Sequence, residues 1–176
     1  MQERKSESVV TINAKFSSFN FEHLRFRDAV NVIEEGRFVC HDATTGFARK
    51  AIETDPAVFV NFLVSSAPSV QDFQTDAFDA NSPVQPLEAG GLSGIEGAGI
   101  ELGIPSDRWY DIATFPPTVG KYVLCFNGGG AVADQGKPRA VAGAALAPGD
   151  ITFGVITKVR GSTIFFLFSS IGHLVS

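Results

Sequence analysis

The sequence predicts a mainly β protein, either a small β-barrel or a β-sandwich, with an extended N-terminal arm and a long, ordered insertion rich in Gly and Pro. One observation is composition: the chain has 17 Val and 11 Ile against 9 Leu, with 16 Phe. Such residues fit a pleated, half-buried surface better than a helix. A second observation is that apolar runs at residues 121–126, 151–159 and 162–168 alternate with turn sequences. These turns are Asn127-Gly-Gly-Gly130, Ala147-Pro-Gly-Asp150 and Arg160-Gly-Ser162.

Length and charge limit the classes of function. With 176 residues, the chain suits one β-rich domain, expected over residues 22–176, preceded by an arm over residues 1–21. The net charge of -5 disfavours a nucleic-acid partner, because phosphate binding needs clustered Lys and Arg. No window approaches the roughly 20 apolar residues of a membrane helix, and the charged N-terminus does not resemble a signal peptide. We therefore expect no nucleic-acid or membrane partner and synthesis in a cytoplasm.

The N-terminal residues predict an extended segment. Residues 1–8 are charged and fit a solvated tail, whereas Val10, Ile12 and Phe16 alternate with polar residues over residues 9–21. Such an arm could add a strand to a neighbouring chain. Residues 26–35 fit either a helical face or a strand, and we favour a strand.

The clearest element of the first half is a β-hairpin over residues 36–51. Asp42 can cap a turn through its side chain, and Gly46 can supply a positive φ between two short strands. Residues 57–65 follow as a strand that is apolar on both faces, which predicts a central position in the sheet.

The character of the sequence changes over residues 66–118, which contain six Pro and a glycine-rich stretch over residues 90–103. We expect regular strand ladders to be short or absent there. Apolar residues nevertheless persist along this segment. It is therefore interpreted as an ordered, loop-rich insertion that packs on the barrel or docks on a neighbouring subunit.

No motif of enzyme or cofactor chemistry is complete. Gly97-Ala-Gly99-Ile-Glu-Leu-Gly103 comes close to a dinucleotide-binding loop, but its third glycine falls one position late and no hydrophobic strand is predicted before it. We interpret it as a surface loop. Gly91-Leu-Ser-Gly94 lacks the spacing of a nucleophile elbow. The expectation is a protein that is not an enzyme and holds no cofactor.

Metal and disulfide sites are likewise disfavoured. Cys40 and Cys125 lie far apart in apolar runs, which is typical of small buried side chains in a reducing compartment. Cys40, His41 and Asp42 adjoin, but neighbours on a strand point to opposite faces, so at most Cys40 and Asp42 could share one face, and a metal site is disfavoured. An acidic cluster supplies only a fragment of a calcium loop and is interpreted as loop capping. Its members are Asp72, Asp76, Asp79 and Asn81.

Two passages resemble tailed-bacteriophage capsid decoration (cement) proteins. Gly36-Arg-Phe-Val-Cys-His-Asp-Ala-Thr-Thr-Gly-Phe-Ala-Arg-Lys-Ala51 resembles their opening hairpin. Val141-Ala-Gly-Ala-Ala-Leu-Ala-Pro-Gly-Asp-Ile-Thr-Phe-Gly-Val155 is similar to their small-residue run followed by a closing hairpin. The resemblance implies a trimeric or dimeric virion protein made in the host cytoplasm. Such a protein binds the capsid exterior and stabilises contacts between major capsid protein subunits.

For such a protein we expect aromatic anchors to dominate binding, because a buried ring contributes far more than a charge at the rim. The candidates are Phe19, Phe21, Phe73, Phe78, Trp109 and Tyr110. We also expect deletion of residues 1–21 to leave a folded domain that no longer binds capsids.

Three alternatives remain open. A tail-tube, neck or baseplate component would also be a β-rich oligomer. A carbohydrate-binding β-sandwich is weakened by the presence of only one Trp and two Tyr. A β-barrel enzyme is the least favoured, because the spacing of histidines and carboxylates matches no known constellation.

Overall fold

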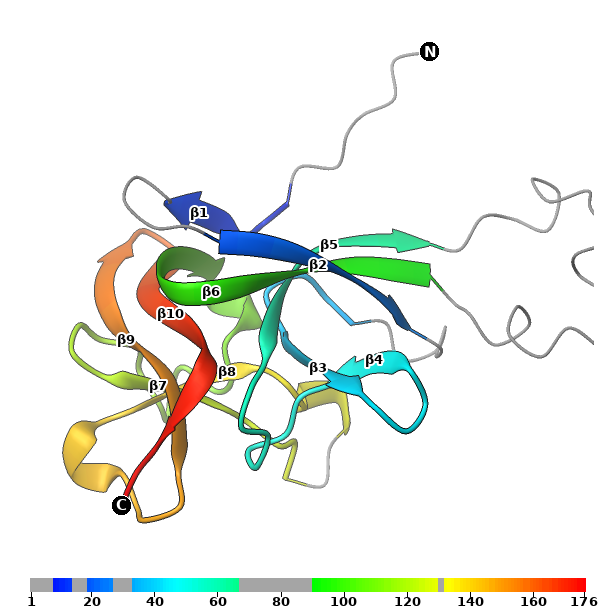
Figure 1. Cartoon of the computed structure of the whole chain (residues 1–176). Coiled ribbons are helices and arrows are strands. Elements are labelled where there is room, and N and C mark those ends of the chain that lie inside the picture. The colour runs from blue at the N-terminus through cyan, green and yellow to red at the C-terminus, as the bar shows by residue number, and fades with distance from the viewer. Residues whose placement is uncertain (1–7, 14–18, 27–32, 67–89, 130–131) are drawn as a thin grey trace, which may run out of the picture.

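The computed structural model describes residues 8–13, 19–26, 33–66, 90–129 and 132–176. These residues form ten strands and three single-turn 3-10 helices, so the prediction of a mainly β fold is confirmed (Figure 1). The strands are β1 (Thr11–Asn13), β2 (Phe19–Phe26), β3 (Phe38–Asp42), β4 (Phe47–Lys50), β5 (Phe59–Ser66), β6 (Gly90–Pro105), β7 (Tyr122–Cys125), β8 (Pro138–Val141), β9 (Ile151–Arg160) and β10 (Thr163–Leu174). The helices are η4 (Ser106–Arg108), η5 (Val132–Asp134) and η6 (Gly143–Ala145).

Strand β6 joins two sheets. Its first half lies between β2 and β5, and its second half lies between β1 and β10. Gly99 stands where β6 passes from one set of partners to the other, with φ +71°. This left-handed conformation is open to glycine at little cost. The facing strand β10 shifts register between Phe168 and Ser169 at the same level, so the glycine and the irregularity together turn the chain from one sheet into the next.

The strands form a ring and a curled sheet that share β6. In the ring, β2, β6, β5, β3 and β4 are paired in that order, and the parallel pair Phe26 with Ala48 closes the circle. The other part is antiparallel throughout, in the order β1, β6, β10, β9, β7 and β8.

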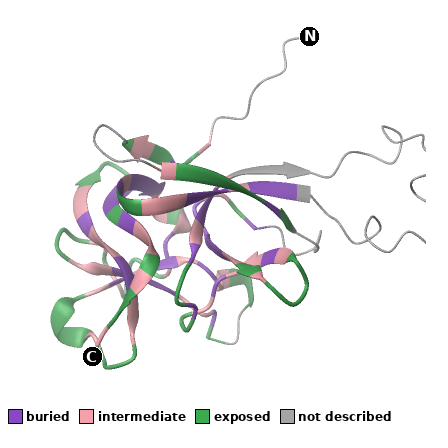
Figure 2. Cartoon of the chain, in the orientation of Figure 1, coloured by how far each residue is buried: buried purple, intermediate pink, exposed green. Residues whose placement is uncertain are grey.

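The main core lies between these two parts, and Figure 2 shows buried residues gathered in the interior. Phe38 is its centre, with ring centroids 5.6 Å from Phe153 and 6.1 Å from Phe168. Each fully buried side chain of this size stabilises the fold by about 1.5–3 kcal/mol through removal from water. A second, smaller core fills the ring and contains Leu24, Val39 and Leu92.

A buried arginine ties the ring to the loop that holds η5. Nη1 of Arg37 donates hydrogen bonds to the carbonyl oxygens of Ala133 and Gln135, at 2.5 and 2.8 Å, and Nη2 lies 3.4 Å from Glu34 Oε2. Charged hydrogen bonds of this kind are stronger than neutral ones. They fix the loop against the first strand of the hairpin.

The predicted hairpin and the later strands are confirmed. Asp42 Oδ1 accepts a hydrogen bond from the Thr44 N–H at 2.9 Å, and Gly46 adopts φ +75°. Strand β5 pairs with both β3 and β6, as expected for a central strand. The runs predicted at residues 121–126 and 151–159 correspond to β7 and β9, whereas β10 extends beyond its predicted end to Leu174.

The expectation of short or absent ladders over residues 66–118 is wrong for residues 90–105, which form the longest strand. Two of the glycines that suggested a loop, Gly94 and Gly103, are covered by aromatic rings. A Cβ at Gly94 would lie 2.8 Å from the Cβ of Phe59, and one at Gly103 would lie 2.6 Å from Cε1 of Phe165. Close packing therefore explains these glycines. The glycine motif interpreted as a surface loop also lies within β6, and residues 67–89 lie outside the described residues.

The expectation of a separate N-terminal arm is wrong for residues 8–13 and 19–21. Strand β1 pairs with β6, and Val10 is 3% exposed within the main core. Phe19 opens β2, which pairs with β6 along its whole length. The apolar side chains of this segment thus pack on the protein's own sheet. Of the strand favoured over residues 26–35, only Phe26 is in a strand, and residues 27–32 lie outside the described residues.

Replacing Val10 by Ala should lower the free energy of unfolding by about 2 kcal/mol, because the lost methyl groups leave a cavity in the core. The neighbouring Val9 is 37% exposed, and Val9→Ala should change that free energy by less than about 0.5 kcal/mol. Urea unfolding of both variants measures the difference. Equal effects would show that the N-terminal segment does not pack into the core.

Candidate functional site

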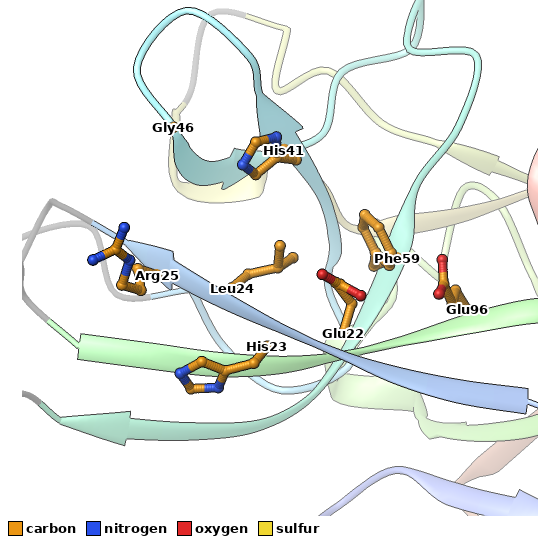
Figure 3. Close-up of a pocket in the computed structure, with 8 residues that line it drawn as sticks. All are labelled: Glu22, His23, Leu24, Arg25, His41, Gly46, Phe59 and Glu96. Atoms are coloured by element: carbon orange, nitrogen blue, oxygen red, sulfur yellow. The ribbon is translucent and has the colours of Figure 1, made fainter.

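A pocket of about 380 Å³ opens beside the interior of the five-stranded ring (Figure 3). Its walls come from β2, β3, β5 and β6, which lie far apart in the sequence. Glu22 and Leu24 belong to β2, Glu96 to β6, Phe59 to β5 and His41 to β3. The pocket therefore exists only when the ring is assembled.

Strand register explains why these side chains converge. Glu22 is paired with Gly94, and Asn20 is paired with Glu96. Residues paired across an antiparallel ladder share a face, so both glutamates point to the ring side of the sheet. Gly94 has no side chain, and Phe59 from β5 lies over it. The result is an aromatic floor flanked by two carboxylates.

Among the described residues, neither carboxylate of the pocket, Glu22 or Glu96, forms a hydrogen bond or an ion pair. The guanidinium of Arg25 lies over the Phe47 ring, 5.9 Å from its centroid. In Figure 3 it points away from the two carboxylates, and His23 lies on the other side of β2. The negative charge of the pocket is thus open to a ligand.

A second polar centre holds the turn between β4 and β5. Asp55 is buried and accepts two hydrogen bonds from Arg49, at 2.8 and 2.7 Å, and one from the Ile52 N–H at 2.8 Å. Burial opposes the charged form of Asp55, but these donors more than offset that effect and hold the pKa of its carboxyl below the usual value. This centre is satisfied internally and stabilises the turn.

The two cysteines are free thiols: Cys125 is buried, as predicted, whereas Cys40 is half-buried. Burial raises the pKa of Cys40, and the nearby Asp55 carboxylate raises it further. Burial also raises the pKa of Cys125. Because the thiolate is the reactive form, both thiols are poor nucleophiles. Within the part of the chain that the structure describes, no group of His, Cys, Asp and Glu could hold a metal ion.

The structure brings two of the predicted docking residues together. The rings of Phe19 and Phe21 meet edge to face with centroids 5.4 Å apart, and Phe62 from β5 lies 5.2 Å from Phe21. Phe21 is 48% exposed. We call Phe19, Phe21 and Phe62 the aromatic cluster. It lies on the face of β2 opposite the pocket.

The other predicted docking residues do not join this cluster. Trp109 was expected to anchor a partner, but it is 4% exposed, packs against Phe166 and donates from Nε1 to the Ile104 carbonyl oxygen at 3.2 Å. That expectation is wrong, because the ring is part of the core. Tyr110 is half-buried and stacks on Phe126 at 3.6 Å. Phe73 and Phe78 lie outside the described residues.

Sequence reasoning missed Glu22, Phe59, Phe62 and Glu96 as site residues. Phe59 and Phe62 were assigned to a central strand, where exposure was not expected. Glu96 lies in a stretch that was interpreted as a loop, so the direction of its side chain could not be predicted. The one available signal was the alternation of Phe21 with Glu22 and Leu24, which is typical of a strand with two different faces.

Comparison with known proteins gives no match. No family model matches the chain, and neither a curated protein nor a solved structure matches it. Among the described residues, no helix is long and apolar enough to cross a bilayer.

Replacing Asp55 by Asn should lower the free energy of unfolding by about 2 kcal/mol at neutral pH, because Arg49 loses its ionised partner. The folded-state pKa of Asp55 lies below the unfolded value of about 3.9. Its stabilisation is therefore fully present above that unfolded value and disappears as the pH falls through the folded-state pKa.

The difference in unfolding free energy between wild type and Asp55→Asn should accordingly shrink below about pH 4. Urea unfolding across a pH series measures it. The exposed Asp107 provides the control, since Asp107→Asn should change the free energy of unfolding by less than about 0.5 kcal/mol. A difference that stayed constant down to low pH would contradict the role of the ion pair.

Proposed function

We propose that the protein is a virion structural protein that binds the outside of a capsid shell and stabilises contacts between major capsid protein subunits. The observation that carries this proposal is the aromatic cluster, with a half-exposed Phe21 on a strand held within a closed ring. An exposed aromatic side chain on a rigid element loses little entropy on binding, so it is suited to docking on another protein.

The chemistry of the described residues favours binding over catalysis. Burial raises the pKa of both cysteine thiols, so little of the reactive thiolate is present. The ion pair of Arg49 and Asp55 stabilises the turn between β4 and β5. The β3–β4 hairpin, which lies in one of the two passages that resemble decoration proteins, forms as predicted. These features support a function in assembly.

A carbohydrate-binding function is less well supported. Sugar recognition by stacking needs an exposed aromatic face. Trp109 is buried, and Tyr110 already has one face on Phe126. Neither ring offers an open platform.

The structure changes the expected mode of docking. Residues 8–13 belong to the folded domain, since Val10 is in the core and β1 pairs with β6. Deletion of residues 1–21 would therefore remove core contacts. It would also remove the whole pairing of β1 with β6 and part of the pairing of β2 with β6. We propose instead that the folded domain docks as a unit through the aromatic cluster, as a dimer or trimer.

Quantitative mass spectrometry of purified particles from the source tests this proposal. A decoration protein should be present at a copy number close to that of the major capsid protein. A copy number that fits only a ring or a short tail would favour a neck, tail-tube or baseplate component. Absence from particles would overturn a virion function altogether.

Replacing Phe21 by Ala should weaken binding to particles by about thirtyfold or more, the effect of losing an aromatic anchor. Stability should change little, because Phe21 is half-exposed. Leu174 is 62% exposed on β10, and Leu174→Ala serves as the matched control with unchanged binding. Co-sedimentation with particles measures both. The reverse result, with only Leu174→Ala impaired, would move the docking surface to the end of β10.

A further inference from the structure

We propose that the pocket beside the ring receives a basic side chain, Arg or Lys, presented by a partner protein. The inference rests on the proposed function only in taking the partner to be a protein. It concerns the face of β2 opposite the aromatic cluster, and it assigns a recognition role to Glu22, Glu96 and Phe59.

The negative charge of the two glutamates is the first feature of the pocket that fits a basic ligand. Glu22 and Glu96 lie on the same face of neighbouring strands, at diagonal positions of the ladder. In Figure 3 their carboxylates lie on either side of the Phe59 ring, with His41 across the pocket. Two carboxylates on the same face repel each other, and a cation placed between them would relieve that repulsion.

Two other carboxylates of the protein, Glu101 and Asp55, are paired internally. Glu101 receives hydrogen bonds from Asn13 at 2.9 Å and Thr157 at 3.1 Å, and it forms an ion pair with Lys158 at 2.8 Å. Asp55 is paired with Arg49 in the same way. Glu22 and Glu96 have no such donors among the described residues, although Glu96 is half-buried. The exposed Glu22 and the half-buried Glu96 are therefore both open to a donor from outside the described residues.

The aromatic floor adds a second attraction for the same kind of ligand. The face of a phenyl ring is negative and attracts a guanidinium or ammonium group within about 6 Å. The protein uses this contact elsewhere, since Arg139 lies 5.3 Å from the Phe115 centroid and Lys158 lies 4.7 Å from the Phe165 centroid. Phe59 is held in place over Gly94, so its ring is ordered before a ligand arrives.

The positive groups near the pocket do not fill it. Arg25 is engaged with the ring of Phe47 and points away from the carboxylates, toward the side of Gly46 (Figure 3). A pocket of about 380 Å³ has room for a long basic side chain, whose aliphatic part would lie on Leu24. Charge, aromatic floor and apolar wall therefore all fit one class of ligand.

Nuclear magnetic resonance titration of the isotopically labelled full chain tests the inference. The probe is the peptide acetyl-Gly-Arg-Gly-amide, with acetyl-Gly-Gln-Gly-amide as the uncharged comparison. The arginine peptide should cause saturable shifts at the amides of β2, β5 and β6 around the pocket. The glutamine peptide should not.

Replacing both Glu22 and Glu96 by Gln should weaken binding of the arginine peptide by about fivefold or more, the loss expected for two solvent-accessible ion pairs. Phe59→Leu keeps an apolar side chain over Gly94 and should weaken binding by about threefold, because it removes the ring. Glu53→Gln is the control, since it removes one exposed charge outside the pocket and should leave binding unchanged. The spectrum of each variant reports whether it is folded.

Equal shifts with both peptides would overturn the inference, as would an unchanged affinity in the double variant or the absence of any saturable shift. The titration uses no virus particles. Its failure therefore overturns the pocket assignment alone, whereas absence of the protein from particles overturns the proposed function alone.

Discussion

Strand β6 is the constraint on which the rest of the structure depends, because it is the one strand that both sheets share among the described residues. Its first half closes the ring with β2 and β5, and its second half supports β1 and β10. A strand with partners on both edges and aromatic rings packed on it needs small residues at defined positions. Gly94 and Gly103 meet that need beneath Phe59 and Phe165, and Gly99 supplies the turn between the sheets.

Strand β2 carries two distinct surfaces, one on each of its faces. Because successive residues of a strand point to opposite faces, Phe19 and Phe21 form the aromatic cluster on one side while Glu22 and Leu24 line the pocket on the other. The ring that fixes β2 also fixes both surfaces. The apolar surface and the acidic pocket are therefore both held in place by the same strand.

Local patterns predicted the parts of the fold whose partners are near in sequence. The hairpin of β3 and β4 followed from Asp42 and Gly46, and the strands β7 and β9 followed from apolar runs bounded by turn residues. Strand β8 was missed because it is short and begins at Pro138. Of the residues predicted to dock on a partner, Phe19 and Phe21 lie together, whereas Trp109 is in the core. An aromatic residue in a Pro-rich segment has the same local pattern whether its ring is buried or exposed.

The sequence by itself determined the β class, the hairpin and the net charge, because composition and short-range turn chemistry control these properties. Only the tertiary structure decided that a glycine-rich stretch is the central strand, that Val10 is in the core and that Glu22, Phe59 and Glu96 share a pocket. The physical reason is the distance along the sequence between the residues that form these features. A glycine is packed against an aromatic ring, and a glutamate lines a pocket, only because the fold brings in residues from distant parts of the chain.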